Sequence, residues 1–199
     1  MRKAKKVIQI IVTFPHFLSW VIIAGFVSSL FTTSGSINDL IYVLGGQRVM
    51  FMSDGRFFLG LLFGADIWKE AGWGSIVYLA TMAGIPQDQY EAADIDGATR
   101  LQKIWHITLP GIKAVAILLL IMSVGGVLSA GFDQIFNLYN PTVYKYADIL
   151  DTYIYRETFQ SYRNPGIGTA VGLFKSVVSF ILVITTDRIA KACGERGII

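Results

Sequence analysis

Charged residues are scarce in this chain of 199 residues, because Lys, Arg, Asp and Glu together make up 16% of it, against about 25% in an average soluble domain. Residues 7–38 contain no charged side chain, and neither do residues 114–132. Hydrophobic residues make up 53%, and the mean hydropathy is +0.54. So few charges cannot cover a water-facing surface of this size. The composition therefore excludes a disordered or collagen-like chain and indicates a membrane protein.

Several chemical sites are also missing. The only cysteine, Cys193, excludes an intramolecular disulfide and a multi-cysteine metal site. His16 and His106 are far apart and have no paired ligand spacing, so neither a metal nor a proton relay is favoured. The sequence has no glycine-rich phosphate loop followed by Lys-Ser or Lys-Thr, and no Gly-x-Ser-x-Gly or metalloprotease pattern. We therefore expect a non-catalytic chain with no cofactor or metal of its own and, at a net charge of only +3, no nucleic-acid partner.

Four apolar stretches predict an all-α, polytopic membrane helical bundle formed by one transmembrane domain over residues 1–199. A signal peptide is disfavoured for the first stretch, because its apolar part is too long and lacks an Ala-x-Ala cleavage pattern. The expected spans are about 7–31, 57–85, 114–132 and 169–186, with a loop over 86–113.

The basic residues predict the orientation of these spans. Of the 17 Lys and Arg residues, ten lie at the two ends and in the 86–113 loop, five lie in the other two loops, and Lys69 and Lys175 lie inside spans. Cytoplasmic loops carry the excess of basic residues. We therefore expect a multi-pass protein of the cell membrane with both termini and the 86–113 loop in the cytoplasm.

The second stretch differs from the others in length and charge. A straight helix over 57–85 would be roughly 43 Å long, so a tilted or broken helix is expected. Asp66, Lys69 and Glu70 lie in its middle. Their spacing of three and four residues lets them neutralise one another, whereas ionisable groups at membrane depth can instead line a transport pathway. Both interpretations remain open.

The 86–113 loop has features of a helix–turn–helix elbow. Glu91 suits the start of a first helix, and Ala92 and Ala93 leave room for close approach. Gly97 permits a positive φ and a sharp change of direction. Thr99 can cap a second short helix, and Pro110 can begin the next span. The expected result is an elbow with a small-residue face and one acidic tip.

These residues carry a resemblance to a known family. The spacing of Glu91-Ala92-Ala93, Gly97, Ile107 and Leu109-Pro110 resembles the EAA loop of permeases of binding-protein-dependent ABC importers. Residues 67–73, 132–135 and 153–156 resemble the carbohydrate branch, and residues 13–20 resemble permeases for polysaccharides or aldouronate oligosaccharides.

The resemblance implies a type I ABC importer permease fold. It implies a second permease subunit, a cytoplasmic ABC ATPase dimer that binds the ATP, an extracytoplasmic solute-binding lipoprotein and a carbohydrate substrate. Glu91 then becomes an ATPase contact and Gly97 the elbow residue. The full set of expected ATPase-coupling residues is Glu91, Ala92, Ala93, Asp96, Gly97, Ala98, Ile107, Leu109 and Pro110.

A sugar site needs aromatic faces and hydrogen-bonding groups. The candidates for the substrate path are Asp66, Trp68, Lys69, Asn137 and Tyr139.

One departure leaves alternatives open. Members of this family usually have two further spans, and this chain begins where the third span would be, which suggests a fragment, a mis-set start or a short variant. Such a fragment would not transport on its own. A secondary transporter is the other alternative, because discontinuous helices and an intramembrane polar patch would suit one, although that class leaves the EAA spacing unexplained.

Overall fold

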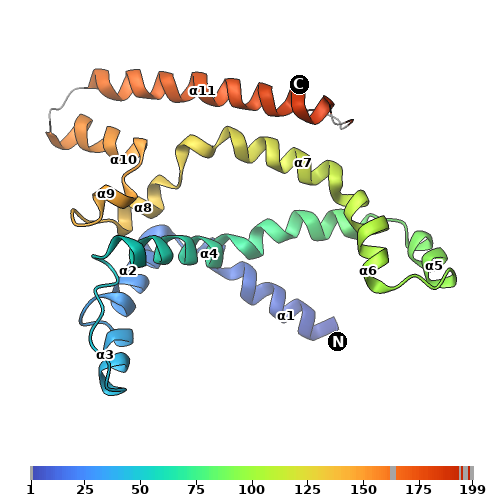
Figure 1. Ribbon diagram of the computed structural model, residues 1–199, viewed down its shortest axis with the longest axis horizontal. Coiled ribbons are helices and arrows are strands. Elements are labelled where there is room, and N and C mark those ends of the chain that lie inside the picture. The colour runs from blue at the N-terminus through green and yellow to red at the C-terminus, as the bar shows by residue number, and fades with distance from the viewer. Residues whose placement is uncertain (1, 162–164, 193, 195–196, 198–199) are drawn as a thin grey trace. The chain divides into compact units, whose positions relative to one another are not determined.

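The computed structural model describes residues 2–161, 165–192, 194 and 197, and its regular structure throughout these ranges is helical, which confirms the all-α prediction (Figure 1). The chain divides into two compact units. The first contains residues 1–73 and 129–171, and the second contains residues 74–128 and 172–199.

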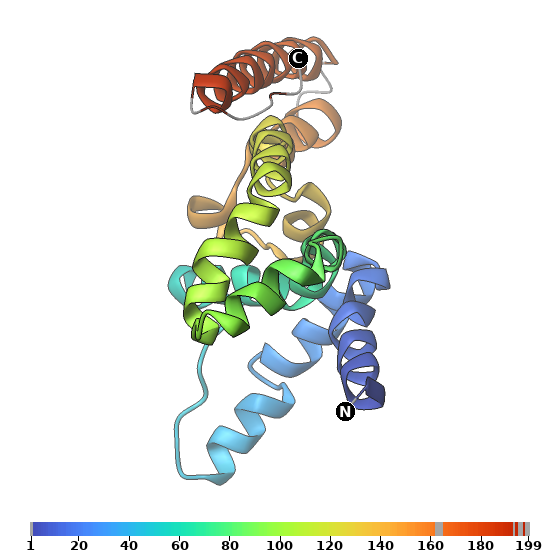
Figure 2. The same ribbon diagram turned by 90° about the vertical axis from the view of Figure 1, so that its right-hand side faces the viewer.

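The N-terminal part of the first unit is interrupted where one span was expected. Helix α1 (Arg2–Thr13) gives way to a 3-10 turn (Phe14–Phe17) before α2 (Trp20–Phe31) begins. Pro15 lies in that turn, and Leu18 is extended, so the hydrogen-bond ladder cannot continue. The Ser19 hydroxyl then accepts a hydrogen bond from the backbone N–H of Ile22 and caps α2. The prediction of a single helix over 7–31 is therefore wrong, and the chain changes direction at the break (Figures 1 and 2).

The core of the first unit forms where α2 packs against α4 (Gly55–Ala83) and the segment from α8 onward. Ile23, Phe58 and Val143 are almost completely buried there. Buried polar side chains in this unit are hydrogen-bonded to backbone groups in several places. Asn38, for example, donates to the carbonyls of Thr32 and Val49. The remaining elements are α3 (Ser36–Val43), α8 (Phe132–Leu138), α9 (Tyr144–Ala147), α10 (Leu150–Tyr155) and a π-helical turn (Arg156–Ser161).

Helix α4 is continuous over its 29 residues, so a break in the 57–85 stretch is not observed. Only its last part, from Gly74, belongs to the second unit. That unit continues with α5 (Gln87–Ile95), α6 (Arg100–Lys103), a π-helical turn (Ile104–Thr108) and α7 (Leu109–Gly125), which is followed by a 3-10 turn (Val127–Ser129).

Helix α7 begins and ends earlier than the expected span over 114–132. Pro110 lies in its first turn, and the chain leaves the helix at Gly125-Gly126, since glycine is a poor helix former. Helix α11 (Pro165–Ala192) contains the whole of the expected fourth span. Within the second unit, a Cβ at Gly125 would lie 3.0 Å from the side chain of Val183, so α7 and α11 approach closely at that point.

Within the described residues, three stretches are long and apolar enough to cross a membrane: Trp20–Val43, Arg100–Gly125 and Pro165–Ala192. Helix α4 is long enough as well. It differs from these three because Asp66, Lys69 and Glu70 lie within it.

Candidate functional site

The loop between α4 and α7 folds as the expected elbow. Helix α5 ends at Asp96-Gly97, where Gly97 has a φ of +73°. The N–H of Ala98 donates back to the carbonyl of Ala93 at 2.9 Å, and the N–H of Gly97 donates to Asp94 at 3.2 Å. A left-handed residue of this kind is normally glycine. The positive φ expected at Gly97 is confirmed.

The second arm of the elbow begins with a capping box. The hydroxyl of Thr99 accepts from the N–H of Gln102, and the Gln102 side-chain oxygen accepts from the N–H of Thr99 at 2.7 Å. The expected cap at Thr99 is confirmed. The arm then passes through the π-helical turn directly into α7, where Pro110 occupies the first turn.

No residue of α5 is fully buried, and only Tyr90 and Ala93 are half-buried, so most of its surface is exposed. Glu91 and Ala92 are exposed, and Ile95 is 87% exposed. Asp96, Leu109 and Pro110 are exposed too. A helix that carries a carboxylate, small residues and an uncovered isoleucine is suited to contact with another protein.

A hollow of about 280 Å³ lies in the angle of the elbow. Ala93 and Ala98 are half-buried at this hollow, where their small side chains leave space. The other lining residues are Gln102, Lys103, His106 and Ile107. The structure therefore brings Ala93, Ala98 and Ile107 together, whereas Glu91 lies outside the hollow.

The ionisable patch of α4 is organised around Lys69, which is only 7% exposed. Its ammonium donates to the backbone carbonyls of His16 at 2.5 Å and Leu18 at 3.0 Å. These carbonyls belong to the interruption between α1 and α2. The carboxylate of Glu70 lies 3.6 Å from the ammonium. Lys69 is therefore a structural residue, and its expected ion pair with Asp66 does not form.

His16 also joins the segment between α1 and α2 to α4. Its Nδ1 lies 2.8 Å from a carboxylate oxygen of Glu70, and its ring stacks parallel on Trp73 with 4.4 Å between centroids. Gly72 lies so close to α1 that a Cβ would collide with the backbone of Val12. No group of three potential metal ligands occurs among the described residues.

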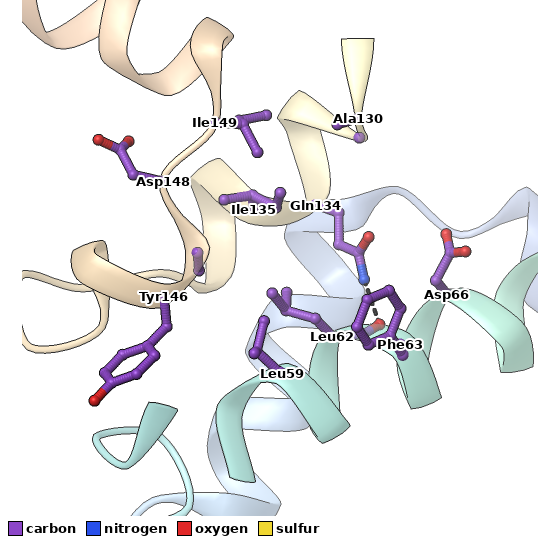
Figure 3. Close-up of a pocket in the computed structure, with 12 residues that line it drawn as sticks. Leu59, Leu62, Phe63, Asp66, Ala130, Gln134, Ile135, Tyr146, Asp148 and Ile149 are labelled. Atoms are coloured by element: carbon purple, nitrogen blue, oxygen red, sulfur yellow. Dashed lines mark hydrogen bonds between the residues drawn. The ribbon is translucent and has the colours of Figure 1, made fainter. Parts of the chain in front are cut away.

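The first unit contains a pocket of about 460 Å³ beside α4 (Figure 3). Asp66 and the Gln134 carboxamide lie at one end and the Tyr146 ring at the other. Gln134 is fixed in place, because its Nε2 donates to the carbonyl of Leu62 at 2.6 Å. Asp66 has no hydrogen-bond donor among the described residues. The remaining walls are mainly apolar: Leu59, Leu62, Phe63, Ala130, Gly131, Ile135, Ala147, Asp148 and Ile149.

Of the five candidates for a substrate path, only Asp66 lines this pocket. Trp68 is 48% exposed on α4, and Lys69 is held by α1 and its following turn. Asn137 donates to the carbonyl of Asp133 within α8, and the Tyr139 ring packs on Tyr144 at 4.7 Å.

Gln134 and Phe63 line the pocket but were not among the expected substrate-path residues, although Gln134 lies in the 132–135 stretch that resembles the carbohydrate branch. Their spacing along the chain carries no signal for the pocket, which depends on α8 packing against α4.

Asp148 and Arg156 form an ion pair at the rim of this pocket. The guanidinium binds both carboxylate oxygens, the closer at 2.5 Å, and Thr152 donates to the carboxylate at 2.7 Å. Burial acts to raise the pKa of Asp148, but the hydrogen bonds from Arg156 and Thr152 outweigh it and hold the pKa below its usual range. The hydrogen bond to Asp148 in turn raises the pKa of Arg156. This pair therefore remains charged at neutral pH.

Residues 2–194 match the family described as the binding-protein-dependent transport system inner membrane component. The polygalacturonan/rhamnogalacturonan transport system permease protein YteP of Bacillus subtilis (strain 168) is 43% identical over 98% of this chain and 60% of its own length. Protein LplB of the same organism is 43% identical over 100% of this chain and 63% of its own length. The chain thus spans less than two thirds of these two relatives.

A solved structure is similar over nearly the whole chain. This is a bacterial alginate ABC transporter in complex with an alginate pentasaccharide-bound periplasmic protein. One of its chains superposes with a TM-score of 0.93 at 40% identity, and the match covers 99% of this chain and 68% of that chain. At this identity the likeness extends to sequence as well as fold.

Proposed function

Because the chain belongs to the family of binding-protein-dependent transport system inner membrane components, we propose that it acts as a permease subunit of an ATP-driven importer. ATP binding and hydrolysis belong to a partner subunit, since the sequence has no phosphate loop of its own. The chain's own part is to contact that ATPase and to change which side of the membrane the transport path faces.

One observation carries this proposal. The elbow presents an uncovered helix, α5, and continues through the second arm into α7, one of the helices long enough to cross a membrane. A partner that moves α5 can therefore move a spanning helix. The proposed contact residues are Glu91 and Ala92 on the exposed face, and Gly97 sets the direction of the helix.

The cargo that we propose is an oligosaccharide or a related carbohydrate. The similar proteins are named for polygalacturonan, rhamnogalacturonan and alginate. The pocket beside α4 supports this cargo, because it combines the Phe63 ring with the Asp66 carboxylate. An aromatic face can pack against a sugar ring, and a carboxylate can accept hydrogen bonds from sugar hydroxyls. A second permease and a solute-binding lipoprotein complete the proposed assembly.

The proposed orientation places both termini and the elbow in the cytoplasm. Replacement of Cys193 by Ser gives a background for single cysteines at Asp54 and at Gln102. A membrane-impermeant thiol reagent added outside intact cells should label Asp54→Cys and not Gln102→Cys. Labelling of Gln102→Cys alone would invert the proposed topology.

The proposed function is tested by affinity purification of a tagged copy of the chain from membranes of its native host, followed by mass spectrometry. An ABC ATPase and a second permease should co-purify in comparable amounts. Deletion of the gene for that ATPase should abolish uptake of the oligosaccharide that supports growth through this system. Recovery of the chain without an ATPase, under conditions that keep it folded, would refute the proposal.

A further inference from the structure

The two arms of the elbow are joined by side-chain contacts at three successive levels, all within the second unit. At the base, a Cβ at Gly111 would lie 2.6 Å from the end of the Ile85 side chain, so the chain entering α5 touches the start of α7. In the middle, the hydroxyls of Tyr90 and Thr108 are 2.9 Å apart. Near the turn, the Lys103 ammonium donates to the Asp94 carboxylate at 2.5 Å.

The π-helical turn Ile104–Thr108 has a part in this arrangement. The hydroxyl of Thr108 contacts the carbonyl of Lys103, five residues earlier, at 3.4 Å, and this spacing follows the wider π-helical turn. The wide turn lies between Lys103 and α7, and therefore fixes where Thr108 faces relative to α5. Insertions of this kind are frequent at functional sites in helices.

The two polar contacts differ in how exposed their side chains are, but both tie α5 to the segment that leads into α7. The Asp94 side chain is 60% exposed, and that of Lys103 is 22% exposed. Tyr90 and Thr108 are both half-buried. Neither contact lies on the exposed surface that Glu91 and Ala92 present. Both contacts join α5 to the second arm, and Lys103 also lines the hollow at Ala93 and Ala98.

We infer that the Asp94–Lys103 and Tyr90–Thr108 pairs are a brace that fixes the angle between α5 and α7, and that this brace transmits ATPase motion to the membrane. The four residues are positioning residues and need not touch the ATPase. This inference rests on the proposed function. An unbraced elbow would still dock on the ATPase, but it would bend at Gly97 when the ATPase moves, and α7 would stay where it was.

The geometry is tested with spin labels at Gln89→Cys on α5 and Ala114→Cys on α7, in a Cys193→Ser background. The distance distribution should be narrow in the parent and broader in Lys103→Asp and in Tyr90→Phe. It should narrow again in the swapped pair Asp94→Lys/Lys103→Asp. The matched controls are Arg100→Asp, which reverses a charge on the same short helix, and Tyr78→Phe, which removes a hydroxyl elsewhere. Both should resemble the parent.

The transmission is tested in the purified complex through the thiol reactivity of Ser123→Cys on α7, with and without a non-hydrolysable ATP analogue. An exposed ion pair and a single hydroxyl hydrogen bond are each modest. Loss of either contact should therefore reduce the ATP-dependent change in thiol reactivity about threefold, and loss of both contacts should reduce it about tenfold. The ATPase should co-purify at the parental level in every variant, and the swapped pair should restore the response.

Two results would overturn the brace. One is a narrow distance distribution in the Lys103→Asp/Tyr90→Phe double variant. The other is a full ATP-dependent response in that variant with the ATPase bound. Absence of the ATPase from the parental complex would instead refute the proposed function, and the spin-label distances would still decide whether the brace exists.

Discussion

The two polar regions of this chain use their charges in opposite ways. On α4, Lys69 is buried, and it is held by two backbone carbonyls of the interrupted N-terminal segment. On α5, Glu91 is exposed on a helix that buries no residue. Both regions interrupt otherwise apolar sequence, so composition alone does not distinguish them.

The difference shows how to separate structural from functional charges in a membrane protein. A charged group at membrane depth that finds partners within its own chain stabilises the fold, because leaving it unpaired would cost several kcal/mol. A carboxylate such as that of Glu91, on the exposed face of α5, does little for the fold. Its partner is then sought in another protein.

The largest effect is expected at Lys69. Lys69→Met removes the donor that satisfies the carbonyls of His16 and Leu18 and leaves Glu70 without its cation. Hydrogen bonds to charged groups contribute about 1.5–3 kcal/mol each, so a loss of about 3 kcal/mol in the free energy of unfolding is expected. Thermal unfolding in detergent measures it. Lys145→Met, on an exposed side chain, is the control, and an equal loss in both variants would contradict the role of Lys69.

The close approach of α1 and α4 is expected to give the next largest effect. Gly72→Ala places a methyl group against the backbone of Val12, and overpacking of this kind costs typically 1–3 kcal/mol. Gly74→Ala is the matched control, because a Cβ at Gly74 meets nothing within 4 Å. Equal unfolding temperatures for the two alanine variants would show that the contact at Gly72 is not tight.

At the elbow, the expected cost in stability is smaller but the expected functional effect is specific. A side chain in the left-handed region costs roughly 1–2 kcal/mol, so Gly97→Val should re-aim α5 while the chain still inserts normally. ATPase activity should then lose its dependence on the loaded binding protein. Gly97→Asn is the conservative variant, since asparagine tolerates a positive φ. Coupled activity in Gly97→Val would contradict the elbow assignment.

The elbow was the most predictable part of the molecule. Gly97, Thr99 and Pro110 act through local backbone rules, so the sequence alone indicated a turn, a cap and a helix start in the right places. The all-α class was predictable for a similar reason, because it follows from composition and the length of apolar stretches.

The interrupted N-terminal helix and the pocket were less predictable. Pro15 could have been accommodated within a continuous membrane helix. The choice between a kink and a break depended on Lys69, which lies far along the chain and satisfies the freed carbonyls. The pocket likewise depends on Gln134 reaching Leu62 across a long sequence separation, and no local pattern reports such a contact.

The smallest effect is expected at the Asp148–Arg156 pair. The pKa of Asp148 is lowered in the folded chain, so its contribution to stability is present above the usual Asp pKa of about 3.9 and is lost as the pH falls through the lowered value. At neutral pH, Asp148→Asn should cost only about 0.5–1 kcal/mol, because the pair is partly exposed. In unfolding temperatures measured from pH 7 down to pH 3, the difference between variant and parent should narrow once the pH falls below the usual Asp pKa. With Asp133→Asn as the control, a constant difference across this range would show that the charge of Asp148 is irrelevant.

The exposed face of α5 is the surface on which we propose that the ATPase docks. A photo-crosslinking amino acid placed at Glu91 in the assembled complex tests it most directly, with Tyr42, which is 65% exposed on α3, as the control position. Illumination should produce a covalent adduct with the ATPase from position 91 and none from position 42. An intact complex that gives no ATPase adduct from position 91, or equal adducts from both positions, would contradict the account.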